Sequence, residues 1–418
     1  MIQFFKIRKA YSIKRALRNF NPHQPLWQSR ELQLFYVSRG GSFLKEVVRL
    51  LKKSTSYYTK ILLSGPPGCG KATELAKINE MLTTRFHVIP ISAKMMTNDF
   101  SLGPEVILFH IIRLIGDLVK EKNKKIFVET VDPLVKRFQG WQIRKASVET
   151  NKQKAPPVML EKIFNLEEAF SGDLISESKL FEKPNSNEYI LGINLAAKAL
   201  EKRGSLFFPG KQVLLLLYDF DKIELESARE VFITTFLPLV KIDCHAVCTF
   251  PLGLKYDRDF INMYRNFDQI YFLENFALKN KNGAINWPAF EKLVDVVQKR
   301  ISLSRIAPET IGRIVNLSGG ILFELINIVR QCCFIALREK VRFIDNEILS
   351  EAEARIRAKY KLALSADDLK NLAKINLSKQ ISEKLNISKF LNQYLITEYG
   401  SGDEVWYDVN PIIKPLLK

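Results

Sequence analysis

The sequence has no long apolar run: no stretch of about 18 apolar residues occurs anywhere in its 418 residues. We therefore expect no membrane-spanning helix. Cysteine is also scarce and odd in number, without the spacing of a disulfide framework; the five are Cys69, Cys244, Cys248, Cys332 and Cys333. This usage favours a reducing environment inside the cell, and we predict a cytoplasmic location.

Histidine is rarer still, and the four histidines, His23, His87, His110 and His245, show no metal-ligand spacing. Cys244, His245 and Cys248 lie close together in the sequence, but no second pair of ligands follows them and we expect a buried strand there. The sequence therefore gives no support for a metalloenzyme or a hydrolase whose metal is held by histidine or cysteine.

Acidic residues are outnumbered: 45 Asp and Glu stand against 63 Lys and Arg, which gives a net charge of +18. Such a charge draws a protein towards polyanions, either nucleic acid or an anionic membrane surface, and charge alone does not choose between them. The first twenty residues hold six basic residues and no acid. They read as a basic docking helix or arm, with an organellar transit peptide as the alternative.

The length suits two or three domains, and the pattern of apolar runs predicts an α/β fold. Short apolar strands are expected at 61–63, 86–92, 213–217, 246–250 and 270–273, with helices at 43–51, 72–82 and 106–119 between some of them. Strands separated by helices imply a parallel sheet covered by helices on both faces.

The chain is divided by these patterns into four predicted parts. Residues 1–42 form the basic N-terminal segment, and 43–275 form the sheet domain, with a poorly patterned, partly mobile insertion at about 121–211. Residues 276–360 are predicted to be helical. Residues 361–418 give short helices followed by a hairpin around Gly400–Asp403, which is the plan of a winged helix.

The most specific motif is a glycine loop between the first strand and the following helix. Gly65, Gly70 and Lys71 fit the pattern GxxxxGK followed by Ser or Thr, in which backbone N–H groups surround phosphates and the lysine neutralises their charge. Ala72 stands where the magnesium-binding hydroxyl belongs. Thr73 is next to it, but one residue along a helix turns the side chain by about 100°, so we do not expect Thr73 to replace that ligand.

The second half of such a site is an apolar strand that ends in acids, one for hydrated magnesium and one for the attacking water. Here the strand runs into Tyr218, Asp219, Phe220 and Asp221. If it ends at residue 217, Tyr218 replaces the metal acid and Asp219 takes the catalytic place. If it ends at Tyr218, Asp219 holds the metal and Phe220 replaces the catalytic acid, and a plain solvated strand end is the alternative for both acids.

These residues together resemble the bacterial and archaeal AAA+ ATPases related to origin-recognition and STAND-type P-loop proteins, over nearly the whole chain. The matching pieces are Phe20–Pro22, Phe35–Val37 with Arg39–Gly40, Ser64–Leu75, Asp219–Lys222, Cys248–Pro251, Leu317–Gly320, Trp406–Asp408 and Asn410–Pro411.

The resemblance implies ATP as the ligand and a set of site residues. Arg39 would lie near the base, Thr249 would sense the terminal phosphate, and the loop residues Gly65, Pro67, Gly68, Cys69, Gly70, Lys71, Ala72 and Thr73 would hold the phosphates. Ser318–Gly320 resembles the lid motif, which in the family carries an arginine three residues later, where this chain has Phe323. Arg265, with Arg258 as second choice, would be the arginine finger that reaches a neighbouring subunit.

Three departures from the family pattern, at Ala72, around Tyr218 and at Phe323, weaken metal binding or charge stabilisation but leave the phosphate loop whole. We therefore predict an ATP-binding switch or assembly factor that is a slow ATPase or pseudo-ATPase, with magnesium ligands depleted. Its expected partners are copies of itself or another protein. The alternative is an inactive scaffold that binds nucleic acid through the basic surface and the winged helix, and an active motor would need Thr73 or Asp221 to replace the missing ligands.

Overall fold

The computed structural model describes residues 7–54, 57–96, 103–141, 185–201, 210–234, 238–381, 387–400 and 404–417. They form two compact units. The sheet unit comprises Val47–Leu62 and Met81–Ile270, and the loop-and-lid unit comprises the chain up to Glu46, Leu63–Glu80 and Tyr271 onward. Residues 142–184 and 202–209 of the predicted insertion lie outside the described residues.

A five-stranded sheet has the order β2-β3-β4-β1-β5. The strands are β1 (Lys60–Ser64), β2 (Phe86–Ser92), β3 (Gln212–Tyr218), β4 (His245–Thr249) and β5 (Gln269–Phe272). β2 pairs in parallel with β3, with Phe86 opposite Gln212, and β3 pairs in parallel with β4, with Leu214 opposite His245. All five predicted strands are present, with ends that differ from the prediction by at most one residue.

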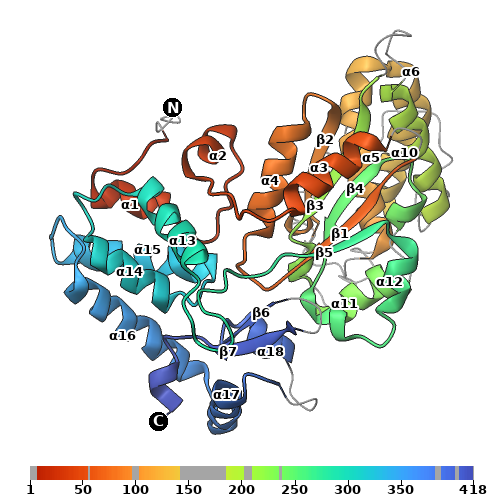
Figure 1. The fold of residues 1–418 in the computed structure, drawn as a ribbon. Coiled ribbons are helices and arrows are strands. Elements are labelled where there is room, and N and C mark those ends of the chain that lie inside the picture. Colours follow the sequence, from red (N-terminus) through yellow and green to blue (C-terminus); the bar gives the residue numbers. More distant parts are fainter. Residues whose placement is uncertain are drawn as a thin grey trace, which may run out of the picture. The chain divides into compact units, whose positions relative to one another are not determined.

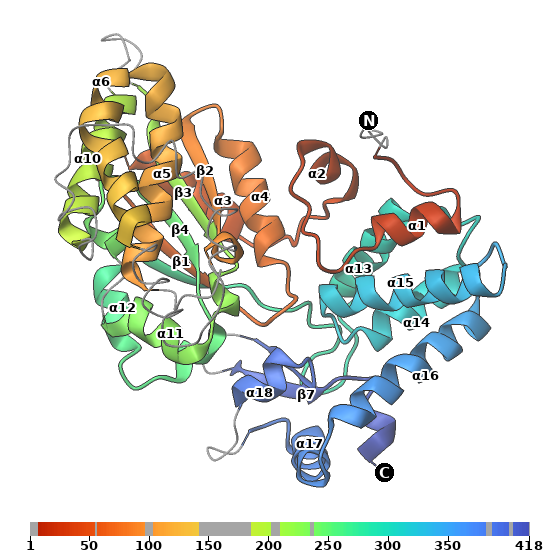
Figure 2. The same ribbon diagram turned by 180° about the vertical axis from the view of Figure 1, so that it is seen from behind.

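Helices cover both faces of this sheet, as predicted. Figure 1 shows α3 (Phe43–Lys53) in front of the strands, and Figure 2, from behind, shows α5 (Pro104–Lys122) and α10 (Ser186–Glu201) in front of them. Val213–Leu217 of β3 are fully buried between these layers, which is why this strand is a continuous apolar run.

Shorter helices complete the sheet unit. They are α6 (Lys124–Ile126), a π-helical turn at Phe127–Val131, α11 (Leu225–Arg229) and α12 (Ile261–Asn266). The helix α10 lies inside the region that the sequence pattern left without structure. Its Tyr189 and Ile193 are fully buried, and α10 packs on α5, so part of the predicted insertion belongs to the core of this unit.

The loop-and-lid unit is named for the glycine loop and for the helical lid predicted at 276–360, where it holds α13 (Trp287–Arg300), α14 (Pro308–Leu317), α15 (Leu322–Arg338) and most of α16 (Asn346–Ala363). The helices α1 (Ile13–Asn19) and α2 (Ser29–Phe35) precede α3 and the glycine loop, and α4 (Lys71–Leu82) follows the loop. Ile13, Ala16 and Phe20 are buried in one hydrophobic core with α13, α14 and α15, and α1 lies beside α15 in both views (Figures 1 and 2). The described part of the basic N-terminal segment is therefore packed into the lid.

The C-terminal part of this unit follows the predicted plan of helices and then a hairpin. Its elements are α16 (Asn346–Ala363), α17 (Ala366–Ser378), α18 (Ile387–Asn392), β6 (Ile396–Tyr399) and β7 (Trp406–Val409). β6 and β7 pair antiparallel, with Tyr399 opposite Trp406. Among the described residues, no helix is both long and apolar enough to cross a membrane.

Candidate nucleotide site

The glycine loop has the strand–loop–helix setting that phosphate binding requires. It joins β1 to the first residue of α4, Lys71, and Gly65, Gly68 and Gly70 all have positive φ. A Cβ on Gly65 would lie 2.2 Å from the carbonyl oxygen of Leu273, and one on Gly68 would lie 2.6 Å from the Cβ of Phe323. Glycine is therefore required at both positions by the backbone angle and by the space.

The lysine of the loop is buried, with 5% of its surface exposed. Its Nζ donates to the carbonyl oxygens of Gly65 at 2.8 Å and Pro66 at 3.0 Å. The ammonium group therefore lies inside the curve of the loop. From there a terminal phosphate can replace the carbonyl oxygens as its acceptor, with a stronger, charge-assisted bond.

Arg39 fastens the loop to the chain that leads into the lid. Its Nη1 donates to the carbonyl oxygen of Cys69 at 2.7 Å, its Nη2 donates to that of Glu274, and its guanidinium lies 4.2 Å from the ring centre of Phe276. The sequence prediction placed Arg39 near the base. In the structure its bonds to two backbone carbonyls position the loop.

The residue at the metal-ligand position of the loop has no hydroxyl group. Ala72 is the second residue of α4 and carries no polar atom, while the Oγ1 of Thr73 accepts a hydrogen bond from the amide of Leu26 at 3.4 Å. The hydroxyl of Thr73 is therefore engaged with the N-terminal segment.

Lid residues contact the loop where the family pattern would place an arginine. The amide of Phe323 donates to the carbonyl oxygen of Gly68 at 3.1 Å. The ring of Phe323 stacks on Tyr394, with centroids 4.7 Å apart and an angle of 4°, and meets the edge of His23 at 5.5 Å. An aromatic cluster thus replaces a positive charge at this place.

The residue next to Phe323 is a buried acid. Glu324 is 1% exposed; its Oε1 accepts from the hydroxyl of Tyr360 at 3.0 Å, and its Oε2 is buried without a hydrogen-bond partner among the described residues. Burial raises the pKa of Glu324 to about 7, and the hydrogen bond from Tyr360 opposes that shift. The first turn of the lid helix α15 therefore carries an acid that titrates near neutral pH.

In the sheet unit, β3 ends at Tyr218, which is the second of the two registers considered above. Asp219 follows with a left-handed backbone, φ 65°, and is 8% exposed. Its Oδ2 accepts from the Oγ of Ser92 at 2.9 Å, and its Oδ1 pairs with the ammonium of Lys222. Both carboxylate oxygens therefore have partners, and one of them is a cation.

The residues that follow Asp219 are a buried phenylalanine and a second acid. Phe220 is fully buried, and its amide donates to the Oγ1 of Thr249 at 3.1 Å, so Thr249 holds the turn after β3. Asp221 lies in the 3-10 turn Phe220–Lys222 and is half-buried. The structure thus brings Asp219, Phe220 and Thr249 together at the ends of β3 and β4.

The two candidate arginine fingers are exposed side chains of the sheet unit. Arg265 lies in the last turn of α12, and Arg258 precedes that helix. Sequence reasoning gave no role to Lys222 or Tyr394. The spacing of Lys222 three residues after Asp219 was a signal for their ion pair, whereas nothing local indicated that Tyr394 would meet Phe323.

Comparison with known proteins gives only remote likenesses. No protein-family model and no curated protein sequence matches the chain. Among solved structures, a Walker-type ATPase of Pyrococcus abyssi is similar at 15% identity and a TM-score of 0.46, covering 96% of this chain and 99% of its own. The Cdc6p protein of Pyrobaculum aerophilum is similar at 11% identity and a TM-score of 0.44, covering 96% and 97%. A Drosophila origin-recognition complex bound to DNA is similar at 11% identity and a TM-score of 0.46, covering 100% and 95%.

The fold is decided by the chain's own geometry. The sheet covered by helices on both faces, the glycine loop between β1 and α4, and the helices that follow β5 are features that the sequence predicted, and the structure adds the strand order β2-β3-β4-β1-β5. The described part of the chain has an α/β fold with a P-loop between β1 and α4.

Proposed function

We propose that this protein is a nucleotide-holding switch that binds ATP at its glycine loop and hydrolyses it slowly or not at all. The observation that carries the proposal is the pairing of Asp219 with Lys222 beside a buried Phe220. A carboxylate that already has an ammonium partner is a poorer ligand for hydrated magnesium, because the metal must displace that cation.

Binding is supported by the part of the site that remains whole. The loop keeps its three positive-φ glycines and a buried lysine, and these groups hold phosphates without any metal. Turnover would need a metal ligand at position 72 and an acid at position 220, and the chain has Ala72 and Phe220 there.

A response to nucleotide is supported by the contacts of the loop within its own unit. Gly68 is hydrogen-bonded to Phe323 of the lid, and Arg39 ties the loop to Glu274. A phosphate that reorders the loop must alter these bonds, so ATP binding is coupled to the lid. The exposed Arg265 is our candidate for contact with a neighbouring copy, and it predicts an oligomer whose size depends on nucleotide.

Equilibrium binding of ATP to the full chain, with and without magnesium, tests the proposal when phosphate release is followed in the same samples. We expect binding that Lys71→Ala abolishes, little help from magnesium, and no turnover. Lys45→Ala, an exposed lysine on α3, is the matched control for loss of one positive charge. Rapid magnesium-dependent phosphate release that disappears in Lys71→Ala would refute the switch and establish an ATPase.

A nucleic-acid-binding scaffold is the second candidate, favoured by the net charge of +18. Three lysines of the C-terminal part are already paired: Lys379 and Lys414 with Asp408, and Lys389 with Asp368. The scaffold predicts DNA or RNA binding that weakens steeply with salt and ignores ATP. Binding that is insensitive to salt would argue against it.

A further inference from the structure

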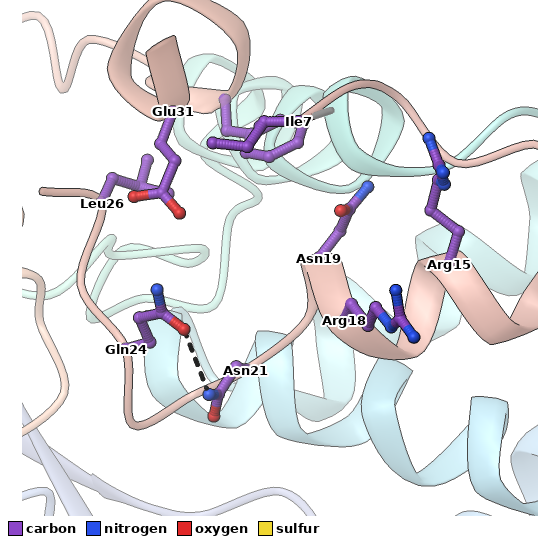
Figure 3. A pocket seen from close by; sticks show the side chains of 9 residues that line it. Ile7, Arg15, Arg18, Asn19, Asn21, Gln24, Leu26 and Glu31 are labelled. Carbon is purple, nitrogen blue, oxygen red and sulfur yellow. Dashed lines mark hydrogen bonds between the residues drawn. The ribbon is translucent and has the colours of Figure 1, made fainter. Parts of the chain in front are cut away.

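A cavity of about 170 Å³ lies in the N-terminal part of the loop-and-lid unit, and no residue of the glycine loop lines it (Figure 3). Its polar walls come from α1, the turn that follows and the start of α2, and are formed by Arg15, Arg18, Asn19, Asn21, Gln24 and Glu31. The other walls are apolar. None of the six polar residues has a part in the nucleotide site described above, and of the apolar lining residues Leu26 contacts that site through its amide, which donates to Thr73.

The walls of this cavity are held by their own hydrogen bonds. The Nδ2 of Asn19 donates to the carbonyl oxygens of Arg8 at 3.1 Å and Arg300 at 2.9 Å. The Oε2 of Glu31 accepts the amides of Trp27 and Gln28, each at 3.2 Å. These side chains are therefore already held in place, so ligand binding would cost little free energy for ordering them.

Acidic and basic side chains lie on opposite sides of the cavity. Figure 3 shows Glu31 on one side and Arg15 and Arg18 on the other. The Nη1 of Arg15 is buried and has no hydrogen-bond partner among the described residues. Arg15 and Arg18 both line the cavity, so their positive charges favour an anionic ligand there.

The volume limits the size of the occupant. An engineered cavity of about 150 Å³ in another protein holds benzene, so a cavity of 170 Å³ fits a ligand of roughly six to ten heavy atoms. Two guanidinium groups match a dianionic phosphate, and the second carboxylate oxygen of Glu31 matches a hydroxyl donor.

We propose that this cavity is a second ligand site, which binds a small phosphate monoester carrying a free hydroxyl. Arg15 and Arg18 hold its phosphate, and Glu31 accepts its hydroxyl. The site does not depend on ATP binding at the glycine loop.

Calorimetry on the full chain tests this site, with glycerol 3-phosphate and inorganic phosphate as probes and glycerol and malonate as controls. The measurement is made in Lys71→Ala, so that phosphate bound at the loop does not contribute. We expect saturable one-to-one binding that weakens about tenfold or more in Arg15→Gln and in Arg18→Gln, because each removes charge-assisted hydrogen bonds. Lys14→Gln, an exposed position on the same helix that does not line the cavity, should bind as before.

The hydroxyl assignment has its own variant: Glu31→Gln should weaken glycerol 3-phosphate more than inorganic phosphate. Arg18 is exposed, so its variant keeps the test informative if Arg15→Gln does not fold. Absence of saturable binding at millimolar concentration, unchanged binding in both arginine variants, or equally tight malonate binding would each overturn the proposal. Binding seen only when Lys71 is intact would assign the phosphate to the loop instead.

Discussion

The glycine loop and the end of β3 differ in how far they follow the P-loop pattern that the sequence resembles. The loop follows it closely, with a buried Lys71 and three glycines with positive φ. At the end of β3, Asp219 is paired with Lys222 and the next residue is a buried phenylalanine. Holding phosphates needs only backbone amides and a lysine, whereas hydrolysis needs charges placed to within a fraction of an ångström. Substitutions are therefore expected to abolish hydrolysis more easily than phosphate binding.

The largest effect that we expect comes from removing the loop lysine. Lys71→Ala should weaken ATP binding by about 100- to 1,000-fold, since the ammonium makes charge-assisted bonds of roughly 1.5–3 kcal/mol each with phosphate oxygens. Equilibrium binding with Lys45→Ala as control measures it. If Lys71→Ala weakens ATP binding by less than threefold, the loop does not bind phosphate through its lysine. The contrast between an intact loop and an altered end of β3 would then be wrong.

The buried acid beside the loop contact should make stability depend on pH. The pKa of Glu324 is raised to about 7 in the folded chain, so the folded state holds its proton more tightly than the unfolded state does. Stability is then fully present below about pH 4.5, falls as the pH rises towards 7, and stays low above it. The fall is as much as about 3 kcal/mol, since one pKa unit corresponds to about 1.4 kcal/mol.

Denaturant unfolding between pH 5 and pH 8 checks this expectation. Glu324→Gln keeps an acceptor for Tyr360 and removes the titration, so the variant should lose the dependence and be more stable than the parent at pH 8. An equal slope in both proteins would show that Glu324 is ionised in the folded chain.

A smaller effect is expected at the contact between the loop and the lid. Gly68→Ala should destabilise the chain by about 2 kcal/mol, because an alanine at φ 72° is strained and its Cβ would meet Phe323. Gly41→Ala is the matched control, since a Cβ there has nothing within 4 Å. Denaturant unfolding compares the two. Equal stability of both variants would mean that the lid moves away from the loop at little cost.

The smallest effect that we expect is a gain of magnesium dependence in a variant that restores the missing metal ligands. Ala72→Ser together with Lys222→Ala supplies a hydroxyl and frees Asp219 from its ammonium partner. We expect magnesium to strengthen ATP binding by about tenfold in this double variant and hardly at all in the parent. Ala72→Ser with Lys222→Arg keeps the cation and should behave like the parent. The same gain in both would exclude the ion pair as the obstacle to metal binding.

Local pattern predicted the strands and the loop because both depend on short-range features. The apolar run of β3, the glycines of the loop and the turn between β6 and β7 each have their signal within ten residues. The helix α10 was missed, because it lies in a segment of mixed composition and is stabilised by packing on α5. The described part of the basic N-terminal segment was expected as a docking helix or arm. Its helix α1 is present, but only the structure shows that Ile13 and Phe20 belong to the core of the lid.

The assigned roles of Lys71 and Asp219 are predictions that the binding experiments above test. The sequence by itself determined the fold class, the phosphate loop and the loss of a hydroxyl at Ala72, because each is written in consecutive residues. Only the tertiary structure showed that Lys222 forms an ion pair with Asp219, that Arg39 is hydrogen-bonded to the loop and that Phe323 stacks on Tyr394. Each of these side chains has several neighbours in the folded chain, and the packing of the whole unit determines which of them it contacts.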